Sequence, residues 1–306
     1  MRIASLLASG TELVCALGLG ERLVGRSHEC DEPAWVRALP ELSRPTFPID
    51  GPSGEIDRHV RSRLRTGAPL YAVDEEKLLA LAPDVVLTQT HCEVCAVSPA
   101  DLACGVPARL DRRRVVALDG STLEAILDGF ARVADVLGAG DEGRALVAKL
   151  RARTGEVAAR VHDRPKPTVA CLEWIDPVFA MGNWGPELVT LAGGRSVLGQ
   201  AAARSTTTTW DSVLEANADV IVVAPCGFAL ERARAEMSTL AARPGWSELR
   251  AVRADRVFVA DGNAYFNRSS PSLFETPALL AEMLHPDLFS PRHEGTAWAR
   301  WRYHQS

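Results

Sequence analysis

The sequence predicts an α/β protein made of two Rossmann-like lobes, and three observations support this prediction. Apolar strands alternate with helical segments through residues 1–119 and again through residues 164–306. Between these halves, residues 121–161 keep the apolar spacing of a helix and contain no strand pattern. Two stretches of the first half also resemble stretches of the second half in the same order. We therefore expect lobes at 1–119 and 164–306, a connecting helical segment at 120–163, and a ligand cleft between the lobes.

The first lobe is expected to contain short apolar strands separated by helices. A capping-box pattern from Ser9 to Glu12 predicts a helix that starts at Leu13. Pro99, at a favoured first helical position, predicts another helix from Ser98. The remaining expected elements of this half are strands at residues 3–7, 23–26, 84–88 and 114–118 and a helix at residues 74–81.

The connecting segment begins with a second capping-box pattern, at Ser121 to Glu124. Its helical pattern is interrupted by glycines at Gly138 and Gly140 and then resumes to about Val161. The second lobe then shows strand patterns at residues 169–174, 220–223 and 257–260 and a helix at residues 186–191. The repeat pairs residues 78–87 with 213–222 and residues 114–120 with 256–262, which favours two similar lobes over one continuous sheet.

Composition and charge narrow the functional class. The 306 residues carry a net charge of -5, which gives no basic footprint for nucleic acid. No stretch approaches the length of apolar sequence that a membrane helix needs. The start of the chain lacks the charged and apolar regions of a signal peptide, and the 7 cysteines are an odd number. These features predict a cytoplasmic protein with free thiols.

Four of the cysteines follow the ends of predicted strands, where open α/β sheets bind their ligands. Cys92 and Cys95 form a Cys-x-x-Cys pair, and Cys30 and Cys226 could join it to hold zinc or an iron–sulfur cluster. A redox pair is a weaker alternative, because the next predicted helix begins after Cys95. Use of these cysteines as small buried side chains is a further alternative. The other cysteines, Cys15, Cys104 and Cys171, fall inside predicted elements and are expected in the core.

The loops after the strands also bring aromatic, carboxylate and hydroxyl side chains toward the predicted cleft. This mixture suits a large flat ligand that needs apolar walls and a few fixed polar contacts. Trp184 lies between glycines at a helix start, so we expect it to be exposed to the cleft. The candidate ligand-binding residues are Ser9, His28, Glu29, Trp174, Asp176, Trp184, Phe228, Tyr265 and Phe266. We find no phosphate-binding glycine loop, nucleophile elbow or acid–base pair, so binding is favoured over catalysis.

Several of these segments resemble one known family. Residues 5–12 (SLLASGTE) with 17–20 (LGLG) resemble the start of the cobalamin- and iron-siderophore-binding proteins of ABC importers. Residues 28–31 (HECD), 92–98 (CEVCAVS), 173–177 (EWIDP) and 225–228 (PCGF) are similar to a narrower cobalamin-binding branch that often lacks a signal peptide. The resemblance covers residues 1 to about 286, and it implies two lobes joined by a long helix with the ligand held between them.

The resemblance also implies a function, with some departures from the family pattern. Ala8 stands where a proline is common, and residues 268–272 (RSSPS) lack an expected glycine and a second arginine. The missing export signal argues against delivery to a membrane permease. The leading hypothesis is binding of a small-molecule ligand, a cobalamin-type corrinoid, with a thiolate or His28 approaching the cobalt. The alternatives are a four-cysteine metal or iron–sulfur protein, and a solute receptor whose cysteines are purely structural.

Overall fold

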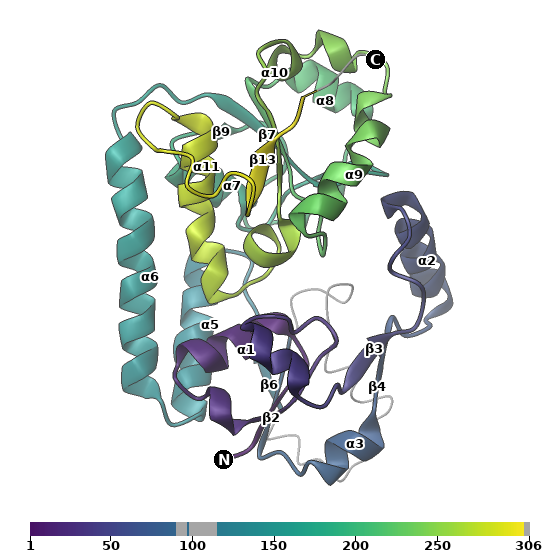
Figure 1. Ribbon diagram of the computed structural model, residues 1–306, viewed down its shortest axis with the longest axis vertical. Helices are drawn as coiled ribbons and strands as arrows, with labels where there is room; N and C mark the ends of the chain where they lie inside the picture. Colours follow the sequence, from purple (N-terminus) through teal and green to yellow (C-terminus); the bar gives the residue numbers. More distant parts are fainter. Residues whose placement is uncertain (90–96, 98–114, 303–306) are drawn as a thin grey trace. The chain divides into compact units, whose positions relative to one another are not determined.

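The computed structural model describes residues 1–89, 97 and 115–302, which form two compact α/β units (Figure 1). Unit 1 comprises Met1–Gly51, Glu55–Lys149 and Ser269–Pro271, and unit 2 comprises Pro52–Gly54, Leu150–Arg268 and Ser272–Ser306. The fold class predicted from the sequence, two α/β lobes with parallel strands and a helical connection, is confirmed. The boundaries proposed at residues 119/120 and 163/164 stay a prediction.

The described sheet of unit 1 is entirely parallel. Its strand order is β2-β1-β5-β6, with bounds of Leu23–Arg26, Ile3–Ser5, Val85–Gln89 and Val115–Leu118. The strands are short apolar runs, and β1 and β5 are buried on both faces, as parallel strands usually are. An antiparallel pair, β3 (Ser43–Pro45) and β4 (Tyr71–Val73), lies outside this sheet.

The helices of unit 1 follow its strands, and one of them corrects the sequence analysis. Helix α1 spans Ala8–Ala16 with Leu7 at its N-cap, so the predicted capping box and start at Leu13 are wrong. The N-cap of α5 is Thr122, one residue after the predicted Ser121, and its side chain accepts a hydrogen bond from Ala125 N at 3.1 Å. The other helical elements of this half are η1 (Gly20–Arg22), η2 (Ala34–Ala38), α2 (Ser53–Thr66), α3 (Glu75–Ala80) and α5 (Leu123–Val136).

The connection between α5 and α6 (Gly140–Val161) breaks at Gly138, as the sequence predicted. Gly138 has a φ of 71°, which glycine adopts without strain because it lacks the Cβ that disfavours the left-handed region. Helix α6 is shared between the units, which divide between Lys149 and Leu150.

Unit 2 is built on a mixed sheet whose central strands are parallel. Strands β7, β11 and β12 run parallel, and β8, β10 and β13 join antiparallel. The strand order is β10-β8-β7-β11-β12-β13, and β9 also pairs with β7. The strands are β7 (Thr168–Trp174), β8 (Phe179–Ala180), β9 (Arg195–Ser196), β10 (Thr206–Thr207), β11 (Val220–Val223), β12 (Val257–Ala260) and β13 (Trp298–Arg300).

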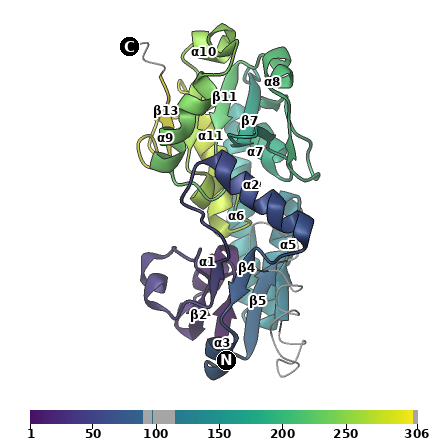
Figure 2. The same ribbon diagram turned by 90° about the vertical axis from the view of Figure 1, so that its right-hand side faces the viewer.

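Helices cover both faces of this sheet. Within unit 2, α7 and α9 lie on opposite sides of the strands (Figure 2), which is the layering expected when helices connect parallel strands. The helical elements are α7 (Gly185–Leu191), α8 (Trp210–Ala216), α9 (Leu230–Ala241), η4 (Trp246–Glu248), α10 (Arg250–Arg253), the π-helix η5 (Gly262–Phe266), η6 (Pro271–Glu275) and α11 (Thr276–Leu284). The carboxyl ends of β7, β11 and β12 therefore meet at one edge, where their following loops gather.

Candidate functional site

The unit 1 edge consists of Ser9, His28, Glu29 and Cys30, which follow the carboxyl ends of β1 and β2. Ser9 is buried in the first turn of α1, and Ser269 Oγ lies 3.5 Å from its hydroxyl oxygen. Glu29 N donates to Ser27 Oγ at 3.0 Å, which fixes the turn that presents these side chains. Glu29 itself is half-buried.

His28 is held between a hydroxyl and an aromatic ring. Its Nδ1 lies 3.1 Å from Ser43 Oγ, and its ring centroid lies 5.3 Å from that of Tyr71. Its Nε2 is buried and lies 4.0 Å from Glu29 Oε1. Burial lowers the pKa of His28 below its usual value, because it penalises the charged imidazolium. At neutral pH this residue therefore offers a neutral ring nitrogen.

Cys30 is more deeply buried than its neighbours, with 1% of its surface exposed. Thr11 Oγ1 donates to its Sγ at 2.9 Å. Burial raises the pKa of the Cys30 thiol, although hydrogen bonds from Thr11 and Ser27 oppose the shift. The thiol is therefore held protonated, which does not favour a thiolate contact to a metal.

The predicted four-cysteine centre is only partly within the described structure. Cys92 and Cys95 lie outside the described residues, as does Cys104. Cys30 belongs to unit 1 and the half-buried Cys226 to unit 2. Among the residues that the structure describes, no group of three or more histidine, cysteine or acidic side chains could hold a metal ion.

The unit 2 edge consists of four residues at or after the carboxyl ends of β7, β11 and β12, namely Trp174, Asp176, Phe228 and Tyr265. The rings of Trp174 and Phe228 meet edge-on, with centroids 5.2 Å apart at 63°. Phe228 is 2% exposed, so Trp174, which is half-buried, presents the accessible part of this pair. Tyr265 is half-buried in the π-helix, and Asp176 is exposed.

Trp184 does not have the exposure that its glycine-flanked position suggested. It is 6% exposed, and its Nε1 donates to Phe266 O at 2.8 Å. Phe266 is 1% exposed. The expectation of an exposed Trp184 is wrong. Its indole N–H is satisfied inside the protein by a backbone oxygen 82 residues further along the chain, so the ring can be buried.

The structure adds polar residues at this edge that the sequence analysis did not select. Ser205 Oγ donates to Glu173 Oε2 at 2.5 Å and accepts from Gly182 N at 2.9 Å. Arg243 pairs with Asp176 at 3.2 Å. Cys226 N donates to Glu173 O at 3.0 Å, which places the loop after β11 beside the end of β7. No local sequence pattern could have revealed these partners, because they lie far apart along the chain.

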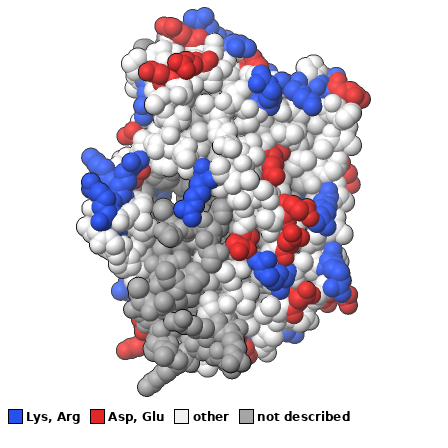
Figure 3. Space-filling model, turned by 180° about the vertical axis from the view of Figure 1, so that it is seen from behind, with Lys and Arg blue, Asp and Glu red and all other residues white. Residues whose placement is uncertain are grey.

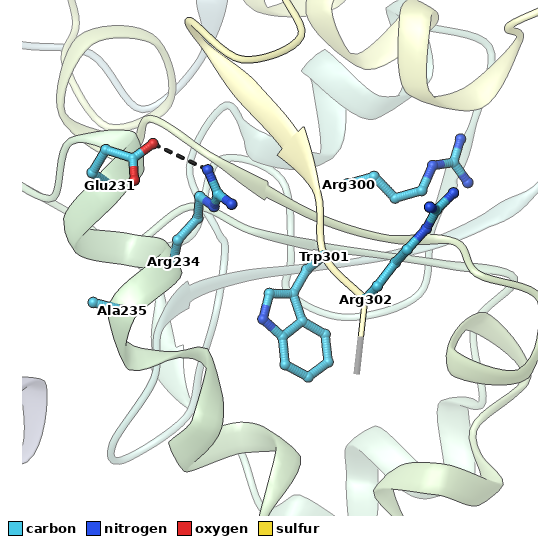
Figure 4. Close-up of a pocket in the computed structure, with 6 residues that line it drawn as sticks. All are labelled: Glu231, Arg234, Ala235, Arg300, Trp301 and Arg302. Atoms are coloured by element: carbon cyan, nitrogen blue, oxygen red, sulfur yellow. Dashed lines mark hydrogen bonds and ion pairs between the residues drawn. The ribbon is translucent and has the colours of Figure 1, made fainter. Parts of the chain in front are cut away.

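A separate pocket of about 480 Å³ lies between α9 and the chain that follows β13 (Figure 4). It is lined by Glu231, Arg234, Ala235, Arg300, Trp301 and Arg302. Trp301 N donates to Val257 O, so the pocket lies by the amino end of β12, away from the unit 2 edge. Glu231 and Arg234 form an ion pair of 3.2 Å across its wall. The predicted site residues do not line it.

The described surface agrees with the composition. On the face shown in Figure 3, acidic and basic side chains are mostly interspersed. This distribution is consistent with the net charge of -5. Among the described residues, no helix combines the length and apolar character needed to cross a membrane.

Comparisons with known proteins connect this geometry to a family. The sequence profile described as periplasmic binding protein matches residues 3–264. An uncharacterized ABC transporter substrate-binding lipoprotein, YvrC of Bacillus subtilis (strain 168), is 22% identical over 302 residues, covering 94% of this chain and 81% of the relative.

Solved structures share the fold at low sequence identity. A periplasmic heme-binding protein from Pseudomonas aeruginosa is 21% identical with a TM-score of 0.72, and 99% of each chain is covered. The periplasmic vitamin B12-binding protein BtuF of Vibrio cholerae is 18% identical with a TM-score of 0.65, covering 92% of this chain and 96% of BtuF.

These relatives correct the expected location. The family and the two solved structures are described as periplasmic, and YvrC is described as a lipoprotein. The prediction of a cytoplasmic protein is therefore wrong. The argument against a permease partner depended on that prediction and no longer applies. The match over residues 3–264 shows that this chain belongs to the periplasmic binding protein family, the substrate-binding proteins of ABC transporters.

Proposed function

We propose that this protein binds a cobalamin-type corrinoid for an ABC importer, and that the aromatic and carboxylate side chains of the unit 2 edge contact the ligand. The observation that carries the proposal is the partly exposed indole of Trp174 beside the carboxylates of Glu173 and Asp176. An aromatic face supplies apolar contact to a flat macrocycle, and the carboxylate oxygens accept hydrogen bonds from its rim.

The chemistry of the rim separates the two ligand types named for the solved relatives. A corrin carries neutral carboxamide side chains, whose N–H groups donate to carboxylates. A haem carries propionates, which carboxylates repel and which need cationic partners. At the unit 2 edge, Arg243 is paired with Asp176, so its charge is already balanced. The carboxylates of Glu173 and Asp176 are therefore the groups that favour a corrinoid over a haem, although the edge also holds the guanidinium of Arg232, 3.8 Å from the centroid of the Phe228 ring.

The test is a titration of purified ligand-free protein with cyanocobalamin, haemin and a ferric hydroxamate, followed by calorimetry and absorbance. We expect cyanocobalamin to bind with low-micromolar or tighter affinity and haemin to bind at least about tenfold more weakly, which corresponds to about 1.4 kcal/mol. Absence of heat and of a spectral change with cyanocobalamin, or tighter binding of haemin, would contradict the proposal.

Two variants connect the binding to the named residues. Trp174→Ala removes the aromatic face and is expected to weaken cyanocobalamin binding about tenfold, whereas Trp174→Phe keeps an aromatic ring and retains more of the affinity. Trp35→Ala is the matched control, because Trp35 is 49% exposed and lies outside both edges. An equal loss in the Trp35 and Trp174 variants would remove the assignment of Trp174.

A further inference from the structure

A short segment from the N-terminal half of the sequence is part of unit 2. Pro52–Gly54 belongs to unit 2, although Gly51 before it and Glu55 after it belong to unit 1. Ser53, the first residue of α2, is 1% exposed. Ser53 is therefore buried, and its hydrogen bonds identify its partners in unit 2.

Glu236 on α9 holds this segment through its carboxylate. Ser53 N donates to Glu236 Oε1 at 2.8 Å and lies 3.1 Å from Oε2, across 183 residues of sequence. The first N–H groups of a helix have no partner within the helix, and a carboxylate there also interacts favourably with the helix dipole. Glu236 thus satisfies the N-terminus of α2 from a distant element.

The same segment contacts the candidate aromatic wall. Trp174 Nε1 lies 3.3 Å from Ser53 O and 3.1 Å from Asp176 O, so the indole N–H is shared between two carbonyls. Ser53 therefore connects Glu236, through its N–H, to Trp174, through its C=O.

Gly54 permits this close approach. A Cβ at position 54 would lie 2.6 Å from Asp176 Oδ2, closer than real contacts allow. Any larger residue would have to push Asp176 or the segment away from the end of β7. Glycine at this position thus leaves room for the Asp176 carboxylate, and a larger residue would displace that carboxylate from its place beside the segment.

We infer that Pro52–Gly54 is a structural part of the unit 2 edge and that Glu236 and Gly54 are positioning residues for Trp174. They fix the orientation of the indole by holding Ser53 against it. The consequence for ligand affinity rests on the proposed function, whereas the effect on the indole does not.

The test uses the indole N–H signals of ¹⁵N-labelled full-length protein, which has 7 tryptophans. The Trp174 signal is assigned by its loss in Trp174→Phe. In Glu236→Ala and Gly54→Ala we expect this signal to shift and its hydrogen exchange to accelerate about tenfold, the factor expected for loss of a charge-assisted hydrogen bond. Glu231→Ala is the control, because Glu231 lies on the same helix with a side chain 78% exposed.

The outcomes distinguish the inference from the proposed function. Glu236→Gln keeps one acceptor oxygen and should shift the Trp174 indole signal less than Glu236→Ala. If the alanine variants do not fold, Glu236→Gln tests whether Glu236 positions the indole. An unmoved Trp174 signal in folded Glu236 and Gly54 variants overturns the inference. If wild type fails to bind cyanocobalamin, the proposed function fails while the indole signal still decides positioning. If wild type binds, we expect about fivefold weaker binding in Gly54→Ala, and unchanged affinity overturns the consequence for the ligand.

Discussion

The reactivity of Cys15 provides a quantitative test of how the thiols of unit 1 are held. Burial raises the pKa of Cys15 from 9.0 to about 11, with smaller contributions from Glu12 and Cys30. Only the thiolate reacts with an alkylating reagent. At pH 8 a pKa of about 11 in place of 9.0 lowers the fraction of Cys15 present as thiolate about a hundredfold.

We therefore expect iodoacetamide to alkylate Cys15 in the native protein about a hundredfold more slowly than in the denatured protein at pH 8. The sign of the shift also predicts the pH profile. In the denatured chain the rate should level off above pH 9, whereas in the native protein it should keep rising toward pH 11. Pulsed labelling followed by mass spectrometry of the Cys15 peptide measures both rates, and the denatured sample is the internal control.

Native labelling of Cys15 at the denatured rate, or a native profile that levels off near pH 9, would refute this reasoning. The result bears on function because a metal would have to displace the thiol proton before binding. Cys30, whose pKa burial also raises, should show the same direction of change. Slow labelling of both thiols would weaken the hypothesis that a unit 1 thiolate contacts a ligand metal.

Three substitutions test other parts of unit 2. Glu282→Ala leaves the buried Trp298 Nε1, now 2.9 Å from Glu282 Oε2, without its acceptor and should lower the free energy of unfolding by about 1–3 kcal/mol in urea titrations. Gly262→Ala would place a Cβ 2.1 Å from a main-chain oxygen after β11 and should lower the melting temperature, whereas Gly155→Ala in α6, with nothing within 4 Å, should not. Ser272→Arg adds a cation to the loop after β12 and should increase haemin affinity about tenfold in calorimetry, because the haem propionates are anionic. Unchanged haemin affinity would contradict this expectation.

The sequence predicted the central strands of unit 2 well. Residues 220–223 and 257–260 were expected as strands, and β11 and β12 have these bounds. Both are continuous apolar runs rich in valine, and every residue in them is buried. A strand buried on both faces carries its own signal, because the requirement for apolar, β-branched residues is local to the strand.

The start of α1 shows why local patterns failed elsewhere. A serine and a glutamate at the right spacing suggested a cap at Ser9, but Ser9 is buried within the first turn and the helix begins at Ala8. Burial of Leu6 and Leu7 in the core of unit 1 sets the entry of the chain and overrides the capping pattern. Tertiary packing therefore decided this boundary.

The candidate site was predictable in its types of residue but not in its partners. Strand ends pointed to Trp174 and Phe228, whose rings do meet. Ser53 and Glu236 had no such signal, because a backbone N–H and a carboxylate 183 residues apart become partners only in the folded chain. The residues that position a binding side chain are consequently the ones that sequence reasoning misses.

Residues 268–272 depart from the family pattern by lacking a glycine and a second arginine, and this difference affects which ligand can bind. Arg268 is 8% exposed, and its guanidinium donates to Asn263 Oδ1 at 2.7 Å. Ser272, in the segment where a second arginine was expected, donates to Ala264 O at 2.8 Å and so helps to hold the π-helix. Both side chains stabilise the loop after β12, and neither adds an exposed cation at this point. The anionic propionates of a haem would find no additional cation in residues 268–272. The neutral carboxamides of a corrinoid could still donate hydrogen bonds to carbonyl and carboxylate oxygens. This difference supports the proposal of a corrinoid over a haem.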